Sequence, residues 1–185
     1  YAMSFFNGML AGKMTETNEI GIIAEKEWQA EIEGFYEGVK YQNPEANIHI
    51  NVINHQTQES LANSMYETIK DASIDVIYPV SDMFSEQIIE AASKDGIYSI
   101  GYVSQPQIEN TRTLVSMILQ IDKIYVNIAE AYDVNQLTGG IVPVDFQSGV
   151  IALGEFHSDV PEDYQQMLKN FIESYIDTHL LPHER

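Results

Sequence analysis

Short apolar runs alternate with longer amphipathic stretches along this chain, and this alternation restricts the fold more than any other feature. Four runs are rich in β-branched residues and are bounded by polar ones, which predicts buried strands. They lie at 19–24, 47–53, 74–79 and 97–102. Between them, apolar residues recur about once per helical turn, at 28–39, 61–69 and 84–91. The order predicts an α/β fold with a mainly parallel sheet covered by helices.

The remaining segments predict further elements around that sheet. An opening helix is expected at 3–14, and 103–113 is expected to be a polar crossing segment. A long helix is predicted from a stripe of large apolar residues, namely Ile118, Ile121, Tyr125, Ile128 and Tyr132. A hairpin is predicted from 141–146 and 150–153, with its turn at 147–149. The last helix is expected to begin near Pro161 and to bury Tyr164, Leu168, Phe171, Tyr175 and Ile176.

Charge and composition exclude several classes of function. The 185 residues suit one domain or one lobe of a larger protein, and the first residues resemble the inside of a helix, so we expect further chain before them. Nine Lys and Arg against 28 Asp and Glu give a net charge of −19, which argues against direct binding of nucleic acid. The absence of cysteine excludes disulfides and thiolate chemistry.

The candidate site is the edge formed by the carboxyl ends of the parallel strands, because ligands of open α/β sheets bind there. Trp28, Phe84 and Tyr102 are candidates for stacking on a planar ligand. Each has an alternative role. Trp28 falls on the apolar stripe of its own helix, which favours core packing, and Ser81 and Asp82 suit helix caps. The candidate ligand-binding residues are Trp28, Asn54, His55, Ser81, Asp82, Tyr102, Ser104 and Gln105.

Motifs that mark enzymes are missing from the sequence. It contains no dinucleotide-binding glycine fingerprint, phosphate-binding loop or nucleophile elbow. His179 and His183 are four apart, but Pro182 between them disfavours a shared metal site. We therefore expect a protein that is not an enzyme and needs no cofactor or metal.

The order and spacing of several short motifs resemble the basic membrane protein (BMP) family along nearly the whole chain. The opening stretch 5–17 is similar to the family's Phe-Leu-Ala-Gly-x-Leu-Ala-Gly-x-Met-Thr-x-Thr. The stretches 34–39, 43–44, 64–66, 75–77, 100–101, 121–122 and 140–149 follow in register. The resemblance implies a periplasmic-binding-protein-like, type I three-layer α/β/α sandwich. It also implies that most of the N-terminal lobe lies outside this chain.

That resemblance divides the chain into three parts. Residues 1–105 would form the second α/β lobe, and 106–157 a crossover, helix and hairpin associated with the first lobe and hinge. Residues 158–185 would return as a helix to the second lobe. Family members bind solutes such as purine nucleosides for ABC importers, as lipoproteins on the extracytoplasmic face of the membrane. Here the family's ligand carboxylates correspond to Val103 and Gln105, and its aromatic loop to 53–56, so the usual nucleoside contacts are altered.

Three hypotheses follow from the sequence. The first is a solute-binding or sensing protein with a nucleoside-like or other small-molecule ligand and an ABC permease as partner. The second is a Med-type member of the family, a positive regulator of competence gene expression, which would act through a regulatory protein partner. The third is the sensor portion of a repressor with a DNA-binding segment elsewhere, for which a cytoplasmic location is the alternative.

Overall fold

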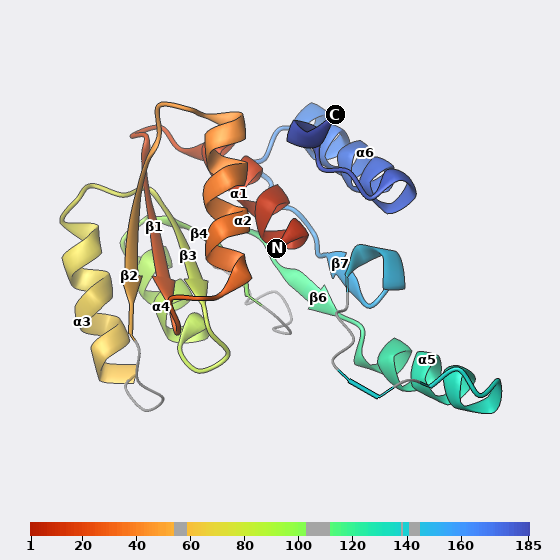
Figure 1. Ribbon diagram of the computed structural model, residues 1–185. Helices are drawn as coiled ribbons and strands as arrows, with labels where there is room; N and C mark the ends of the chain where they lie inside the picture. The colour runs from red at the N-terminus through yellow and green to blue at the C-terminus, as the bar shows by residue number, and fades with distance from the viewer. Residues whose placement is uncertain (54–58, 103–111, 138, 141–144) are drawn as a thin grey trace.

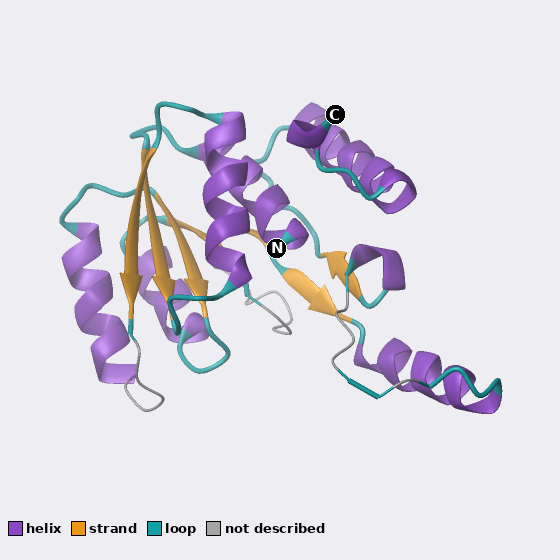
Figure 2. Cartoon of the chain, viewed as in Figure 1, coloured by secondary structure: helices purple, strands orange, loops and turns teal. Residues whose placement is uncertain are grey.

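A parallel sheet and its covering helices make up most of the molecule, as the computed structural model shows (Figures 1 and 2). The structure describes residues 1–53, 59–102, 112–137, 139–140 and 145–185, with the side chains of residues 59 and 60 left aside. The helices are α1 (Ala2–Met14), α2 (Ala30–Gln42), α3 (Glu59–Lys70), α4 (Ser85–Lys94), α5 (Ile121–Asp133) and α6 (Glu162–Thr178). The strands are β1 (Glu19–Ala24), β2 (Asn47–Val52), β3 (Val76–Val80), β4 (Tyr98–Ile100), β5 (Thr113–Val115), β6 (Met117–Leu119) and β7 (Ile151–Leu153).

The main sheet has five strands in the order β2-β1-β3-β4-β5, and every described pairing in it is parallel. Helices α1 and α2 pack on one face, and α3 and α4 cover the other. This confirms the predicted α/β sandwich. The chain runs from β1 to β2 on one side and then returns to β3 on the other side of β1.

Alternate residues of β1 enter two separate cores, as the period of a strand requires. Ile20, Ile22 and Ala24 pack under α1 and α2, while Ile23 packs under α3 and α4. All five residues after Glu19 are buried, which explains the near-continuous apolar run in the sequence.

Helices α1 and α2 approach each other closely because glycines line their contact. A Cβ on Gly38 would meet the backbone carbonyl oxygen of Phe5 and the amide nitrogen of Met9. A Cβ on Gly8 would likewise meet the carbonyl oxygen of Phe35. The glycine-rich opening segment is therefore half of a tight helix pair that lies over the sheet.

The predicted elements between 103 and 153 need correction. The strands β5 and β6 were missed, because a three-residue strand gives little periodic signal. Ile118 lies in β6, and the following helix begins at Ile121. The described partner of β7 is β6, antiparallel, and Phe146 belongs to a short 3-10 turn (Phe146–Ser148) instead of a hairpin strand. The rest of the predicted first hairpin strand, 141–144, lies outside the described residues.

The last helix follows its predicted position with one shift of register. Pro161 stands at the N-cap position, one residue before the helix begins. Of the predicted stripe, Tyr164 and Leu168 are buried, and Phe171 and Tyr175 are partly buried and pack against the core. The prediction was wrong for Ile176, which is exposed, and it missed the buried Ile172. The Tyr164 hydroxyl donates to the Met9 carbonyl oxygen at 2.9 Å, which attaches α6 to α1.

Candidate functional site

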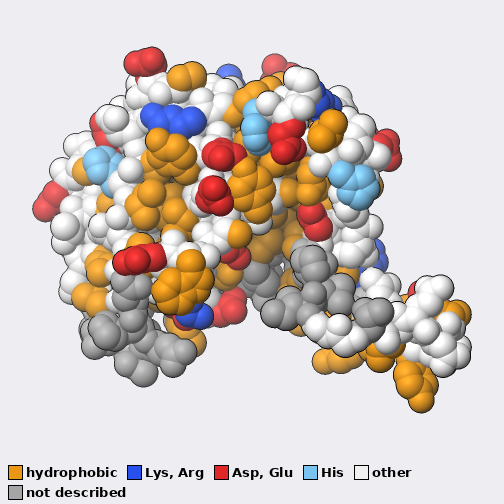
Figure 3. All heavy atoms as spheres, in the orientation of Figure 1, with side chains coloured by type: hydrophobic (Ala, Val, Ile, Leu, Met, Phe, Trp, Pro, Cys, Tyr) orange, Lys and Arg blue, Asp and Glu red, His pale blue; other side chains and the backbone are white. Residues whose placement is uncertain are grey.

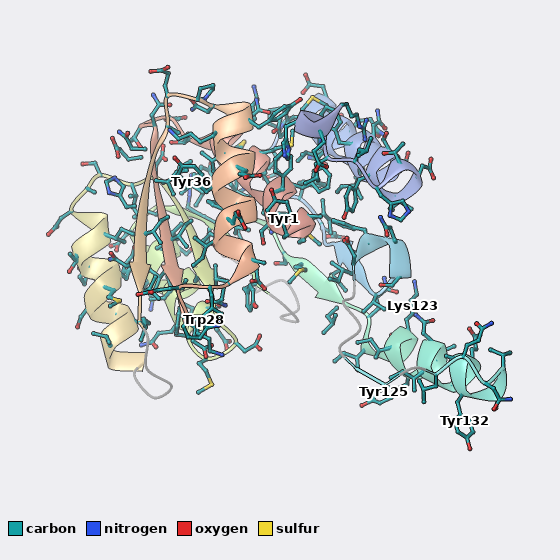
Figure 4. The ribbon with its side chains drawn as sticks, in the orientation of Figure 1. Tyr1, Trp28, Tyr36, Lys123, Tyr125 and Tyr132 are labelled. Carbon is teal, nitrogen blue, oxygen red and sulfur yellow. The ribbon has the colours of Figure 1, made fainter. Side chains whose placement is uncertain are left out.

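The order of the strands marks one end of the sheet as the candidate ligand crevice. Because β2 and β3 flank β1 on opposite sides, the connections leaving β1 and β3 diverge to opposite faces. Such a switch point, at the carboxyl ends of the strands, is where open α/β sheets bind ligands. The loop 25–29 follows β1 and the turn 81–84 follows β3, so these two segments flank the crevice. Figure 4 shows Trp28 at this end of the sheet.

Trp28 points into solvent and does not pack in the core, so that expectation was wrong. Its side chain is 78% exposed. The reason is local: α2 begins only at Ala30, so Trp28 belongs to the loop before the first helical turn and lies off the helix's apolar stripe. A large, exposed aromatic ring at a switch point is suited to stack on a ligand. Met83, 62% exposed, lies on the neighbouring turn.

Ser81 and Asp82 lie in the crevice turn, but neither is the helix cap that the sequence predicted. The N-cap position of α4 is Phe84, and it makes no side-chain capping bond. Ser81 is buried; its hydroxyl accepts from the Met83 amide at 3.0 Å and donates to the Glu25 carboxylate at 3.3 Å. Asp82 is exposed. Ser81 therefore closes its own turn and ties it to the loop after β1.

Tyr102, two residues after the end of β4, is half-buried beside an aromatic stack. Its ring centroid lies 6.4 Å from that of Tyr78, which stacks on Phe35 at 4.7 Å. Its hydroxyl donates to Glu31 at 3.4 Å. Burial, followed by the negative charge of Glu31, raises the pKa of Tyr102. The hydroxyl therefore stays protonated at neutral pH.

The other sequence candidates have different outcomes. Asn54, His55, Ser104 and Gln105 lie outside the described residues, so their place at the crevice stays a prediction. Phe84, a further candidate for stacking, is buried in the core under α3 and α4.

Sequence reasoning missed two residues at the crevice, Gln29 and Glu31. The side-chain carbonyl oxygen of Gln29 accepts from the amides of Glu25 and Lys26, both at 2.9 Å, and its amide donates to the Val80 carbonyl oxygen at 3.3 Å. A glutamine beside a helix start is not a favoured cap, and that mismatch was the available signal.

Charge around the crevice follows the acidic composition of the chain. Figure 3 shows Asp and Glu side chains spread over the visible face with few Lys and Arg. Within the described part of the chain, no group of three His, Cys, Asp or Glu is placed to hold a metal ion. Among the same residues, none of the helices is both long and apolar enough to span a bilayer.

The family model for Bmp, described as ABC transporter substrate-binding protein PnrA-like, matches residues 1–184. The chain belongs to this family. It is also similar to the transcriptional activator protein Med of Bacillus subtilis strain 168, with 37% identity over 182 residues. That match covers 98% of this chain and 57% of Med.

Solved structures give the same picture. A transcriptional activator of the comK gene from Bacillus halodurans superposes with a TM-score of 0.92 at 35% identity, covering 99% of this chain and 65% of that one. An ABC transporter solute-binding protein from Conexibacter woesei gives a TM-score of 0.75 at 16% identity, covering 97% and 61%, and shows the fold alone. The chain spans 57% to 65% of the length of these three relatives.

Proposed function

We propose that this Bmp-family protein is a non-enzymatic solute-binding or sensing protein whose ligand contacts the crevice beside Trp28. The observation that carries the proposal is an indole 78% exposed at the switch point between β1 and β3. An indole at this position offers a flat apolar face on which a planar or apolar ligand group would stack.

The described side chains restrict what kind of ligand fits. Tyr102 supplies a protonated hydroxyl, and the carboxylates of Glu31 and Asp82 are available as acceptors. The charge of Glu25 is partly offset by Lys26, whose ammonium nitrogen lies 3.5 Å from its carboxylate. An anion would meet net repulsion at this edge, so a neutral or positively charged ligand suits it better. With Val103 and Gln105 at the family's carboxylate positions, the ligand need not be a nucleoside.

The second half of the cleft would come from a first lobe. In this proposal residues 1–105 form the second lobe, 106–157 belong to the hinge and first lobe, and 158–185 return to the second. Helix α5 supports this division, because none of its residues is buried. Closure of the two lobes on a solute would be sensed by an ABC permease or a regulatory protein. In this proposal the protein is a lipoprotein on the extracytoplasmic face of the membrane.

A thermal-shift panel of nucleosides, nucleobases, sugars and amino acids tests the proposal. A compound at about 100 times its dissociation constant stabilises the fold by about 2.7 kcal/mol, which moves the midpoint measurably. We expect one chemical class to raise the midpoint and Trp28→Ala to abolish the shift. Tyr36→Ala is the matched control, since Tyr36 is an exposed aromatic on α2. A shift that survives Trp28→Ala would contradict the proposed site.

The likeness to Med and to the comK activator favours a second candidate function. In that case the protein would be a positive regulator of competence genes that acts through protein contacts, with an altered pocket. The net charge of −19 argues that this chain does not hold DNA itself. Fluorescence anisotropy of labelled duplex DNA at low salt tests whether such a regulator acts on DNA directly or through protein contacts. We expect no binding to the DNA. A panel without any stabilising compound would favour this candidate over the first.

A further inference from the structure

One glutamine side chain joins the two segments that flank the crevice. The Gln29 carbonyl oxygen accepts from two successive amides, those of Glu25 and Lys26, while its amide nitrogen donates to the Val80 carbonyl oxygen. Glu25 and Lys26 directly follow β1, and Val80 is the last residue of β3. Gln29 therefore bridges the ends of the two strands between which the crevice opens.

Gln29 makes these bonds in place of the usual role of its position. It is the N-cap residue of α2, yet its side chain makes no bond to the helix. The amides that it satisfies lie beyond the last ladder pair of β1, at Ala24, so the sheet no longer provides their partners. A partly buried amide left unpaired is unfavourable. The side chain thus stabilises the loop and not the helix.

A second bond makes the two segments one unit. The buried Ser81 hydroxyl donates to the Glu25 carboxylate, and Ser85 donates to the Pro79 carbonyl oxygen at 3.1 Å behind it. Between these bonded residues stand the two exposed apolar side chains of the crevice, Trp28 and Met83. The indole itself has little protein around it, so the protein sets the place of the Trp28 backbone and leaves the ring free to change rotamer.

We propose that Gln29 is a positioning residue that holds the 25–29 loop and so fixes Trp28 at the crevice before any ligand arrives. The consequence for ligand affinity rests on the proposed function, but the ordering of Trp28 does not. Fixing the loop that carries the ring in advance lowers the conformational cost of binding. Loss of the three bonds would leave the same side chains present but no longer held in one arrangement.

Trp28 reports on this directly, because it is the chain's one tryptophan. Time-resolved fluorescence anisotropy and acrylamide quenching measure its local motion and exposure without any ligand. Gln29→Ala is expected to add a fast nanosecond component to the anisotropy decay. Gln29→Glu keeps an acceptor for the two amides but sets a carboxylate oxygen against the Val80 carbonyl oxygen, so it should restore only part of the order.

Gln165→Ala is the matched control. The Gln165 side-chain amide donates to the Val160 carbonyl oxygen at 2.9 Å, so it too is a glutamine that bonds the backbone near the start of a helix, here α6. We expect it to lower the unfolding midpoint without changing the Trp28 decay. NMR hydrogen exchange measures the amides of Glu25 and Lys26. They should exchange faster than in wild type in Gln29→Ala, and at the wild-type rate in Gln165→Ala.

The outcomes separate the two proposals. If Gln29→Ala lowers only the midpoint and leaves both the Trp28 decay and the two amides unchanged, Gln29 is structural and the inference is overturned. If Trp28 loosens while no compound of the panel binds, the positioning role holds and the proposed function fails. Where a compound of the panel does bind, its affinity should fall about 2–10-fold in Gln29→Ala. If Gln29→Ala does not fold, the decay and exchange of Gln29→Glu decide.

Discussion

Helices α2 and α5 have the same length, 13 residues, and both have an amphipathic pattern. One of them is packed against the protein, and the other is exposed to solvent. Helix α2 packs against α1 and buries Phe35 and Val39 over the sheet. Helix α5 extends away from the body in Figure 1 and buries none of its residues. Its tyrosines, Tyr125 and Tyr132, are each 70% exposed and labelled in Figure 4.

The contrast teaches that an amphipathic pattern predicts a helix and a buried face, but not what buries that face. A helix of this length is marginal in water without packing. The apolar residues of α5 therefore point to a covering surface that the described part of the chain does not supply. The parallel sheet and helices α1 to α4, in contrast, form their own core.

The sharpest test of this contrast compares one substitution in both regions. Ile22→Ala removes a fully buried side chain from β1 and should cost about 2–5 kcal/mol of the free energy of unfolding. Ile128→Ala removes an exposed side chain from α5 and should stay within about 0.5 kcal/mol. Urea unfolding of both variants measures the difference. An equal loss for Ile128→Ala would show that the α5 face is already covered in this chain.

A second comparison uses glycines. Gly38→Ala pushes a methyl group into the backbone of α1, where neither helix can give way, and should cost up to about 3 kcal/mol. Gly139→Ala, where a Cβ meets nothing within 4 Å, is the control and should leave the thermal midpoint unchanged. A tolerated Gly38→Ala would contradict the close α1–α2 contact.

The smallest expected effect concerns the segment between β7 and α6, which contacts β4 through Asp159. The Tyr98 hydroxyl donates to Asp159 at 2.5 Å, and this bond lowers the pKa of that carboxyl. A lowered carboxyl pKa gives stability that is present above the unfolded value of roughly 3.9 and lost as pH falls through the folded value. Tyr98→Phe should therefore lower the midpoint at pH 7, with the difference from wild type vanishing in acid. If the difference between the two midpoints stayed constant across pH, the charge of Asp159 would not contribute to the bond's effect on stability.

The fold up to Tyr102 was predictable from the sequence, because its longer strands and helices repeat their period over many residues. The strand at 19–24 matches β1 at both ends, and Asn43-Pro44 ends α2 as its backbone chemistry requires. Beyond Tyr102 the strands are three residues long and pair with distant partners, which no local pattern reveals. At the site, the strand ends predict an edge of the sheet, and that assignment stays a prediction. The exposure of Trp28 depended on where α2 begins, and boundaries are the weakest part of such predictions.

A competing location for a ligand also exists in the described structure. A mostly apolar groove of about 270 Å³ lies between β7 and α6, lined by residues that include Phe146, Phe156 and Ile172. None of its lining residues belongs to the parallel sheet, and Trp28 does not line it. A compound that stabilises the protein could bind in either place, so stabilisation alone does not identify the crevice.

Titration of Trp28 fluorescence with the compounds that raise the midpoint tests the central claim most directly. A ligand covering the indole should shift its emission to shorter wavelength or quench it, with saturation at the concentration that stabilises the fold. Stabilisation with no change in Trp28 emission would place the ligand elsewhere and contradict the assignment of the crevice as the binding site.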